Sequence, residues 1–153
     1  MSCVDDFIFA KKLVRERKLD KAILLLNKLR ENDPKRSNYL YHLSKAYRFK
    51  RNFYDAEISI VMAIGLENNN RLYHHEYATF LHYNKKDYNK ALLEYNHALK
   101  LHSKFLDDKF MDSKLHFDTG LCLLHGFKDY INSEHLFKES LKYWNLNPNC
   151  LWR

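Results

Sequence analysis

The sequence predicts an all-α protein built from about four stacked helix-turn-helix repeats. The chain of 153 residues contains only three Gly and two Pro, so few positions interrupt helices. No run alternates polar and apolar residues, as a half-buried strand would. Small residues also recur at intervals of 34 and 35 residues, which indicates a repeated helical unit.

The segment 90–101, KALLEYNHALKL, shows the repeated pattern most clearly. Ala91, Tyr95 and Ala98 are spaced i, i+4 and i+7, so they lie on one helix face. Small side chains allow a neighbouring helix to approach to about 8–9 Å, while the ring fills the adjoining gap. The aligned small residues of the four copies are Ala22, Ala56, Ala91 and Ser133.

Each copy has a second predicted helix upstream, marked by its own small residue. These residues are Ala10, Ser44, Ala78 and Gly120. They precede the downstream small residue by 12 positions in the first two copies and by 13 in the last two, so we expect a one-residue longer turn there. A single helix pair cannot bury both of its faces, and the copies must therefore stack into a solenoid with a concave and a convex side.

In these residues the chain resembles the tetratricopeptide repeat (TPR) family. The second repeat matches the family pattern with Leu40, Leu43, Ser44, Tyr47, Phe53, Ala56, Ile60 and Ala63. The resemblance implies a right-handed α-solenoid. We predict one domain over 1–153, with repeats at about 3–36, 37–70, 71–105 and 113–146.

The interval between the last two repeats is longer than the others. Ala91 and Ser133 are 42 residues apart, and the excess lies at about 102–113. Because Leu106, Phe110 and Lys114 follow i+4 spacing, we expect lengthened helices that offer a lip to a partner. The alternative is an insertion that is tolerated because it faces water.

The resemblance also implies that the first helix of each repeat lines the concave groove. The candidate partner-binding residues are Phe7, Lys11, Tyr41, Lys45, Arg48, His75, Thr79, His82, Phe117 and Leu121. This aromatic and apolar lining with a cationic end suits a peptide that carries apolar anchors and acidic residues. The alternative for each residue is ordinary packing. The family's two-carboxylate clamp for chaperone peptides is not predicted, because Tyr41, Leu72 and Glu76 replace its cationic or amide groups.

Positive charge is concentrated in the N-terminal third. Residues 1–51 hold 14 basic and six acidic side chains, whereas 52–153 hold 12 and 13. Such a field attracts acidic peptides, anionic membrane surfaces or nucleic acid, although it can also be a solvated helix face. Nucleic-acid or ribonucleoprotein binding is therefore the second functional hypothesis. Its stacking residues would be Tyr39, Tyr41, Tyr47 and Phe49.

The sequence predicts no metal, no cofactor and no enzymatic activity. His75 and His82 lie two helical turns apart, about 10.5 Å along the axis, which is too far for one metal ion. No glycine-rich phosphate loop, nucleophile elbow or paired carboxylate motif is present. Cys122 lies among apolar neighbours, which favours a buried inert thiol over one activated by His125.

The remaining features concern location and the end of the last repeat. Three cysteines without metal-ligand spacing indicate a reducing compartment, no segment is long enough for a membrane span, and we expect a cytoplasmic protein. No polar capping helix follows the last repeat near Trp144. Either Leu151 and Trp152 fold back over that face, or it meets another subunit or a partner, which we favour. The leading functional hypothesis is a non-catalytic scaffold, adaptor or assembly chaperone that holds a peptide or protein in its groove.

Overall fold

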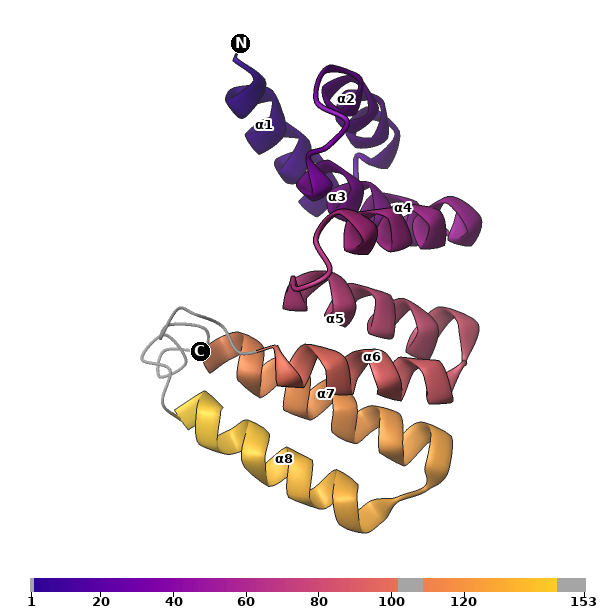
Figure 1. Cartoon of the computed structure of the whole chain (residues 1–153), viewed down its shortest axis with the longest axis vertical. Coiled ribbons are helices and arrows are strands. Elements are labelled where there is room, and N and C mark those ends of the chain that lie inside the picture. Colours follow the sequence, from indigo (N-terminus) through magenta and orange to yellow (C-terminus); the bar gives the residue numbers. More distant parts are fainter. Residues whose placement is uncertain (1, 102–108, 146–153) are drawn as a thin grey trace. The chain divides into compact units, whose positions relative to one another are not determined.

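The computed structural model describes residues 2–101 and 109–145 (Figure 1). Every regular element within these residues is helical, which confirms the all-α repeat class. The first helices are α1 (Cys3–Arg15), α2 (Leu19–Asn32), α3 (Ser37–Phe49) and α4 (Phe53–Leu66). They are followed by α5 (Arg71–Phe80), the π-helical turn η1 (Leu81–Lys85), α6 (Tyr88–Lys100), α7 (Lys109–Phe127) and α8 (Tyr130–Asn145).

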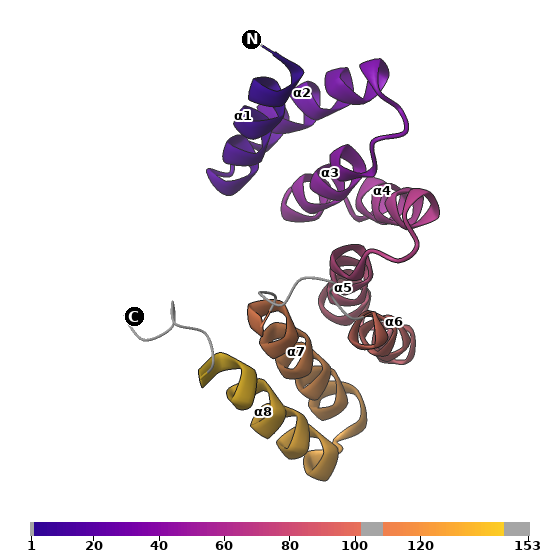
Figure 2. The same cartoon turned by 60° about the vertical axis from the view of Figure 1, so that its left-hand side comes forward.

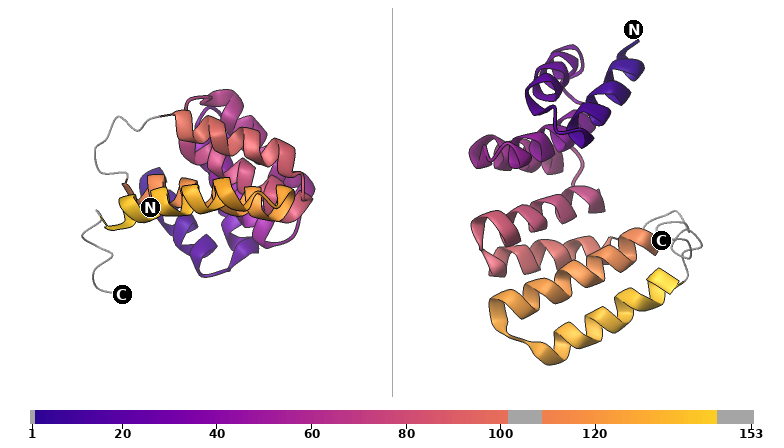
Figure 3. Two further views of the ribbon diagram at one scale, coloured as in Figure 1. Left: turned by 90° about the horizontal axis from the view of Figure 1, so that it is seen from below. Right: turned by 180° about the vertical axis from the view of Figure 1, so that it is seen from behind.

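The helices form two compact units, Met1–Asn69 and Asn70–Arg153. In the first unit α1 pairs with α2 and α3 with α4, and α2 packs against α3 (Figure 2). In the second unit α5 pairs with α6 and α7 with α8, and α6 packs against α7 (Figure 3). The boundary between the units coincides with the predicted junction of the second and third repeats. The single domain over 1–153, the stacking of all four repeats and the right-handed sense stay predictions.

The helix boundaries agree with the predicted repeats. The first three repeats begin with helices at Cys3, Ser37 and Arg71, as expected. The fourth begins at Lys109, before the predicted 113, and α7 has 19 residues whereas α1 has 13. Residues 109–113 are therefore helical, 102–108 lie outside the described residues, and the lengthening over 102–113 stays a prediction.

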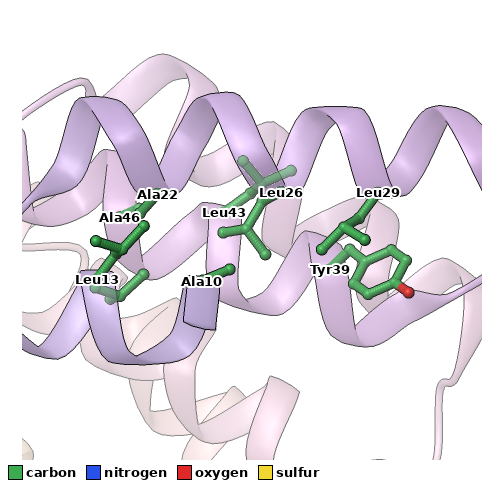
Figure 4. Packing of buried hydrophobic residues seen from close by; sticks show 9 residues of the cluster. Ala10, Leu13, Ala22, Leu26, Leu29, Tyr39, Leu43 and Ala46 are labelled. Atoms are coloured by element: carbon green, nitrogen blue, oxygen red, sulfur yellow. The ribbon is translucent and has the colours of Figure 1, made fainter. Parts of the chain in front are cut away.

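The small residues of the first unit lie in its core. Ala10, Ala22 and Ala46 are fully buried, and they belong to one cluster with Leu26 and Leu29. Figure 4 shows Ala22 beside Ala46, and Leu29 beside the ring of Tyr39. Large and small side chains therefore alternate where α1, α2 and α3 meet, as the repeat pattern predicts. In the second unit the same holds for α6, where Ala91, Tyr95 and Ala98 are fully buried.

Gly120 shows why the upstream position must be small. A Cβ atom added at Gly120 would lie 2.7 Å from Cε1 of Phe137, closer than a real carbon contact allows. Phe137 follows Ser133 by four residues, so it is the large residue of the small-large-small seam on α8. The large residue of the second helix thus covers the small residue of the first helix.

The extra residue of the later repeats lies in the last turn of the first helix. In the first repeat the N–H of Lys18 donates to the carbonyl of Leu13 at 2.9 Å. In the third repeat the N–H of Asp87 donates to the carbonyl of Leu81 at 3.0 Å, which closes a ring one residue larger. In the third repeat this wider closure accompanies the π-helical turn Leu81–Lys85, at whose end the N–H of Lys86 also donates to the Leu81 carbonyl. The predicted longer turn is therefore a widened helix end.

A basic residue with a left-handed backbone stands in each of these connections. The four residues are Arg17, Arg51, Lys86 and Lys128, with φ between 56° and 65°. Each lies two residues before the bulky residue that starts the second helix. A side chain with a Cβ is strained in this region by about 1–2 kcal/mol, and glycine is not.

We expect Lys128→Gly to raise the free energy of unfolding by about 0.5–1 kcal/mol, because relief of the left-handed strain exceeds the added entropy of the unfolded chain. Lys138→Gly, in the interior of α8, should instead lower it by about 1 kcal/mol. Urea denaturation of both variants gives the comparison. Loss of stability in Lys128→Gly would contradict the strained turn.

Candidate partner-binding surface

A positively charged pocket lies between α1 and α3 of the first unit. It has a volume of about 270 Å³. Its lining residues are Ile8, Lys11, Val14, Arg15, His42 and Lys45. Three of these six side chains are lysine or arginine and none is acidic. The pocket therefore presents a cationic surface beside apolar side chains.

The helices place these residues for local reasons. Ser2 and Asp5 form a capping box that fixes the start of α1. Ala10 and Leu13 are buried against the neighbouring helices, so Lys11 and Arg15, four residues apart, share a face that borders the core. His42 and Lys45 are three residues apart on α3, so they likewise share a face of that helix that borders the core.

Aromatic rings flank the pocket and support its lysines. The ring of Phe7 packs edge-on against those of Tyr39 and His42, with centroids 5.0 and 5.4 Å apart. Lys11 Nζ lies 4.9 Å from the Phe7 ring centroid, and Lys45 Nζ lies 5.3 Å from that of Tyr41. These cation–π contacts, each worth about 0.5–1 kcal/mol, favour ammonium positions above the rings.

His42 is neutral at pH 7. The pKa of His42 is lowered to about 4, mainly by burial and to a lesser extent by the charges of Lys45 and Lys11. A neutral imidazole can accept or donate a hydrogen bond, but it carries no positive charge that would attract an anion. The positive charge of the pocket therefore comes from its lysine and arginine side chains.

The structure places four predicted residues at this pocket, since Lys11 and Lys45 line it and Phe7 and Tyr41 support them. The fifth, Arg48, lies near the end of α3 with its guanidinium carbon 4.8 Å from the Phe49 ring centroid. Three lining residues were missed by sequence reasoning, namely Ile8, Arg15 and His42. The i+4 spacing of Arg15 from Lys11 was the signal that could have found one of them.

In the second unit, three predicted groove residues make contacts within the fold. His75 is 8% exposed, and its Nε2 lies 2.6 Å from Asp118 of α7. The Thr79 hydroxyl donates to the His75 carbonyl at 2.8 Å. His82 is 1% exposed, and its Nε2 lies 2.9 Å from Nδ1 of His125. His75 and His82 join α5 and η1 to α7, whereas the Thr79 hydroxyl bonds within α5. We assign all three a packing role and keep their contact with a ligand only as a prediction.

The last two predicted residues belong to α7. Leu121 is half-buried, whereas Phe117 is 47% exposed. Phe117 lines a cavity of about 320 Å³ between α7 and α8. The described residues that line it are Phe110, Ser113, Lys114, Phe117, Ser140, Leu141 and Trp144. Among these residues Lys114 is the one charged side chain, so this lining is more apolar than that of the pocket in the first unit.

Cys122 is a buried and unreactive thiol, as predicted. Its side chain is fully buried, and its Sγ donates to the Tyr88 carbonyl at 3.6 Å. Burial raises the pKa of Cys122 to about 11, so the thiolate needed for nucleophilic attack is scarce at neutral pH. The alternative, a thiol activated by His125, is contradicted by this direction.

Residues 2–101 and 109–145 contain neither a metal-binding cluster nor a membrane-spanning helix. No three His, Cys, Asp or Glu side chains in these ranges are grouped so that they could hold a metal ion. His75 and His82, the pair considered from the sequence, contact different partners. None of the helices in this part of the chain combines the length and the apolar character needed to cross a bilayer.

Comparison of the sequence with protein-family models and with curated proteins gives no match. Solved structures do match. MamA superposes with a TM-score of 0.76 at 16% identity, covering 95% of this chain and 80% of that one. PilW, a type IV pilus biogenesis factor, gives 0.81 at 15% identity, covering 92% of this chain, which spans only 61% of PilW.

A third match is the first TPR domain of Spaghetti (RPAP3), solved with an HSP90 peptide. It gives a TM-score of 0.61 at 14% identity, covering 92% of this chain and 90% of that one. Identities this low establish the fold alone. The three structural matches agree with the repeat pattern of alanines, the paired helices and the turns described above. The chain is therefore a protein of the tetratricopeptide repeat fold.

Proposed function

We propose that this chain is a non-catalytic protein-interaction module, used as a scaffold, adaptor or assembly chaperone. Its first unit would hold an acidic segment of a partner protein on the surface formed by α1 and α3. The observation that carries this proposal is the pocket itself, in which Lys11, Arg15 and Lys45 surround a small volume that no acidic side chain lines. A fold alone does not define a function, so the proposal rests on this chemistry.

The recognition would combine charge and apolar packing. Aspartate or glutamate side chains of the partner would accept charge-assisted hydrogen bonds from Lys11, Arg15 and Lys45. Hydrogen bonds to charged groups contribute about 1.5–3 kcal/mol each. An apolar side chain of the same segment would pack on Ile8, which is 54% exposed. A short extended or helical segment can supply both groups.

The RPAP3 domain bound to an HSP90 peptide shows one use of this fold and supports peptide binding in general terms. We do not propose the same ligand here. Tyr41, Leu72 and Glu76 stand where a two-carboxylate clamp for such peptides would need cationic or amide groups.

The proposal is tested with an array of ten-residue peptides that combine three acidic residues with leucine or phenylalanine. Peptides that bind are then titrated against Lys11→Glu/Lys45→Glu. We expect affinity to fall at least tenfold, since two charge-assisted contacts become repulsive. Calorimetry or fluorescence anisotropy gives the dissociation constants.

The matched control is Lys21→Glu/Lys28→Glu, which makes the same change in net charge at exposed positions of α2. It should leave the affinity within about twofold, because screened charges outside the pocket contribute little. If the control loses as much affinity as the pocket variant, the charge of the whole unit attracts the peptide and the pocket proposal fails.

Nucleic-acid binding remains the second hypothesis, and the contacts of its aromatic residues disfavour it. Tyr39 is 2% exposed in the core of the first unit. The Phe49 ring has the guanidinium carbon of Arg17 3.5 Å from its centroid and that of Arg48 4.8 Å away. Both rings are thus used within the fold. Binding of RNA with a steep salt dependence would instead support this hypothesis.

The remaining parts of the proposal rest on the sequence. We keep a cytoplasmic location because the three cysteines suit a reducing compartment. The absence of catalytic activity is proposed because the reactive candidate, Cys122, is buried and protonated.

A further inference from the structure

The cavity between α7 and α8 has the form of a docking groove. Exposed apolar side chains make its walls, with Phe110 52%, Leu141 57% and Trp144 42% exposed. Its floor is small and polar, because the Ser113 hydroxyl donates to the Ser140 carbonyl at 3.0 Å. The two helices lie side by side along their length (Figure 3). A groove of this kind accepts a large side chain between two helices.

The internal repeat identifies what such a groove binds. Phe117 precedes the small residue Gly120 by three positions, as Phe7 precedes Ala10 in the first repeat. The Phe7 ring is partly covered by the next repeat, because it packs against Tyr39 of α3 with centroids 5.0 Å apart. The α7 wall of the cavity is therefore equivalent to a surface that is covered by the first helix of the following repeat.

The α8 wall of the cavity is also equivalent to a surface that the following repeat covers. Ser140 follows Ser133 by seven positions, as Leu29 follows Ala22. Leu29 is 3% exposed and lies beside the Tyr39 ring (Figure 4). In the first repeat, Phe7 of α1 and Leu29 of α2 thus both lie against one inserted side chain, Tyr39, which α3 carries.

The second unit contains another inserted side chain of this type. Leu115 of α7 lies five positions before Gly120, as Tyr39 lies five before Ser44, and Leu115 is fully buried. The helix that carries it is also tied to the third repeat by an ion pair between Asp112 and Arg71. The chain thus fills its own grooves with an inserted tyrosine, Tyr39, or leucine, Leu115, and the helix that carries Leu115 also bears the carboxylate of Asp112.

The first helix of a second copy would be a poor occupant. Its residue five positions before Ala10 is Asp5, which caps α1 by accepting from Ser2. Insertion of this carboxylate between Phe117 and Trp144 would remove it from water without a matched partner, which is strongly unfavourable. Head-to-tail stacking of copies is disfavoured for this reason.

We propose that the α7/α8 cavity binds an amphipathic helix of a partner protein, which inserts a leucine or tyrosine between Phe117 and Trp144. The helix lies across α7 and α8 as α3 lies across α1 and α2. An acidic residue beside the inserted side chain faces Lys114, the one charged side chain among the described lining residues. Recognition then follows the helix-in-groove mode, with apolar anchors for affinity and one charge for orientation. This surface is independent of the basic pocket in the first unit.

The test uses Trp144 as its reporter. Trp152→Phe leaves Trp144 as the only tryptophan of the chain. The probe is a stapled helical peptide with the sequence of residues 109–121, which carries Leu115 and Asp112, and the control peptide has Leu115→Asp. Addition of the probe should shift the Trp144 emission to shorter wavelength and reduce its quenching by acrylamide, whereas the control peptide should bind at least tenfold more weakly.

Two matched substitutions locate the binding surface. Leu141→Glu changes an exposed wall residue of the cavity and should weaken binding at least tenfold. Ile131→Glu changes a residue of the same helix that is 82% exposed and does not line the cavity, so it should leave binding unchanged. Both positions are exposed, so both variants should fold. Equal effects of the two substitutions would overturn the proposal.

Three other results would also overturn it. The first is no response of Trp144 to the probe. The second is a Trp144 that is already shielded in the monomer and becomes exposed when residues 146–153 are deleted, since the chain itself would then fill the cavity. The third is shielding that increases with protein concentration together with a dimer in sedimentation, which would make a second copy the occupant.

Discussion

We expect Ala22→Leu to lower the free energy of unfolding of the first unit by about 3 kcal/mol. Ala22 is fully buried where α2 meets α1 and α3, beside Ala46 (Figure 4). A leucine adds three heavy atoms at a point where two helices are in close contact, so the helices must separate or the side chain must leave its preferred rotamer. Overpacking of this kind costs about 1–3 kcal/mol and occasionally more. Leucine and alanine differ little in helix propensity, so the loss measures packing.

Lys21→Leu is the matched control, because it places the same side chain one residue earlier on α2 at an exposed position. Its effect should stay within about 0.5 kcal/mol. Urea denaturation followed by circular dichroism compares the two variants. Because the chain has two compact units, the transition should be analysed for two steps. If Ala22→Leu is as stable as Lys21→Leu, the small residues are not needed for close helix packing.

The sequence contains most of the information about this fold, because the repeat is local. Small residues at fixed spacing identified both helices of each pair, and the helices at Cys3, Ser37 and Arg71 begin where expected. The widened end of the first helix was harder to place, since one extra residue fits either a loop or a helix turn. Hydrogen bonding decides between them. The N–H of Asp87 reaches Leu81, so the helix itself widens.

Less of the candidate site could be predicted. The cationic end of the groove was recognised from Lys11 and Lys45, and both line the pocket. His82 was expected to face a ligand because of its position on the helix. Its Nε2 contacts His125, a residue 43 positions away on α7, and its contact with a ligand stays a prediction. Contacts over such sequence separations depend on how repeats stack, and the pattern within one repeat carries no information about them.

The burial of His82 leads to a pH dependence of stability. The pKa of His82 is lowered to about 4, mainly by burial and then by His125 and Lys86, while Asp118 acts in the opposite direction. In the unfolded chain the pKa of a histidine is about 6.5. Between pH 6.5 and pH 4 the unfolded state therefore binds more protons than the folded state. The stability present above pH 6.5 is lost as the pH falls through this range.

The size of this effect follows from the shift. Protonation of the unfolded state between pH 7 and pH 5 lowers the free energy of unfolding by about 2 kcal/mol for one fully buried histidine with this pKa. His82 is 1% exposed, so solvent screens this effect little. The pKa of His42 in the first unit is also about 4, and because its side chain is half-buried we expect about half of that effect there. Each unit thus contains one histidine that makes it less stable in acid.

His82→Gln separates this contribution from all other titrations. Glutamine keeps a polar group that can bond to His125 but does not titrate, so the loss between pH 7 and pH 5 should be about 2 kcal/mol smaller than in the unchanged protein. His135→Gln removes an exposed histidine of α8 and should leave the pH dependence unchanged. Urea denaturation at both pH values measures the two differences. An equal loss in His82→Gln and in the unchanged chain would mean that His82 takes up a proton in the folded state as readily as in the unfolded chain, so that burial does not lower its pKa.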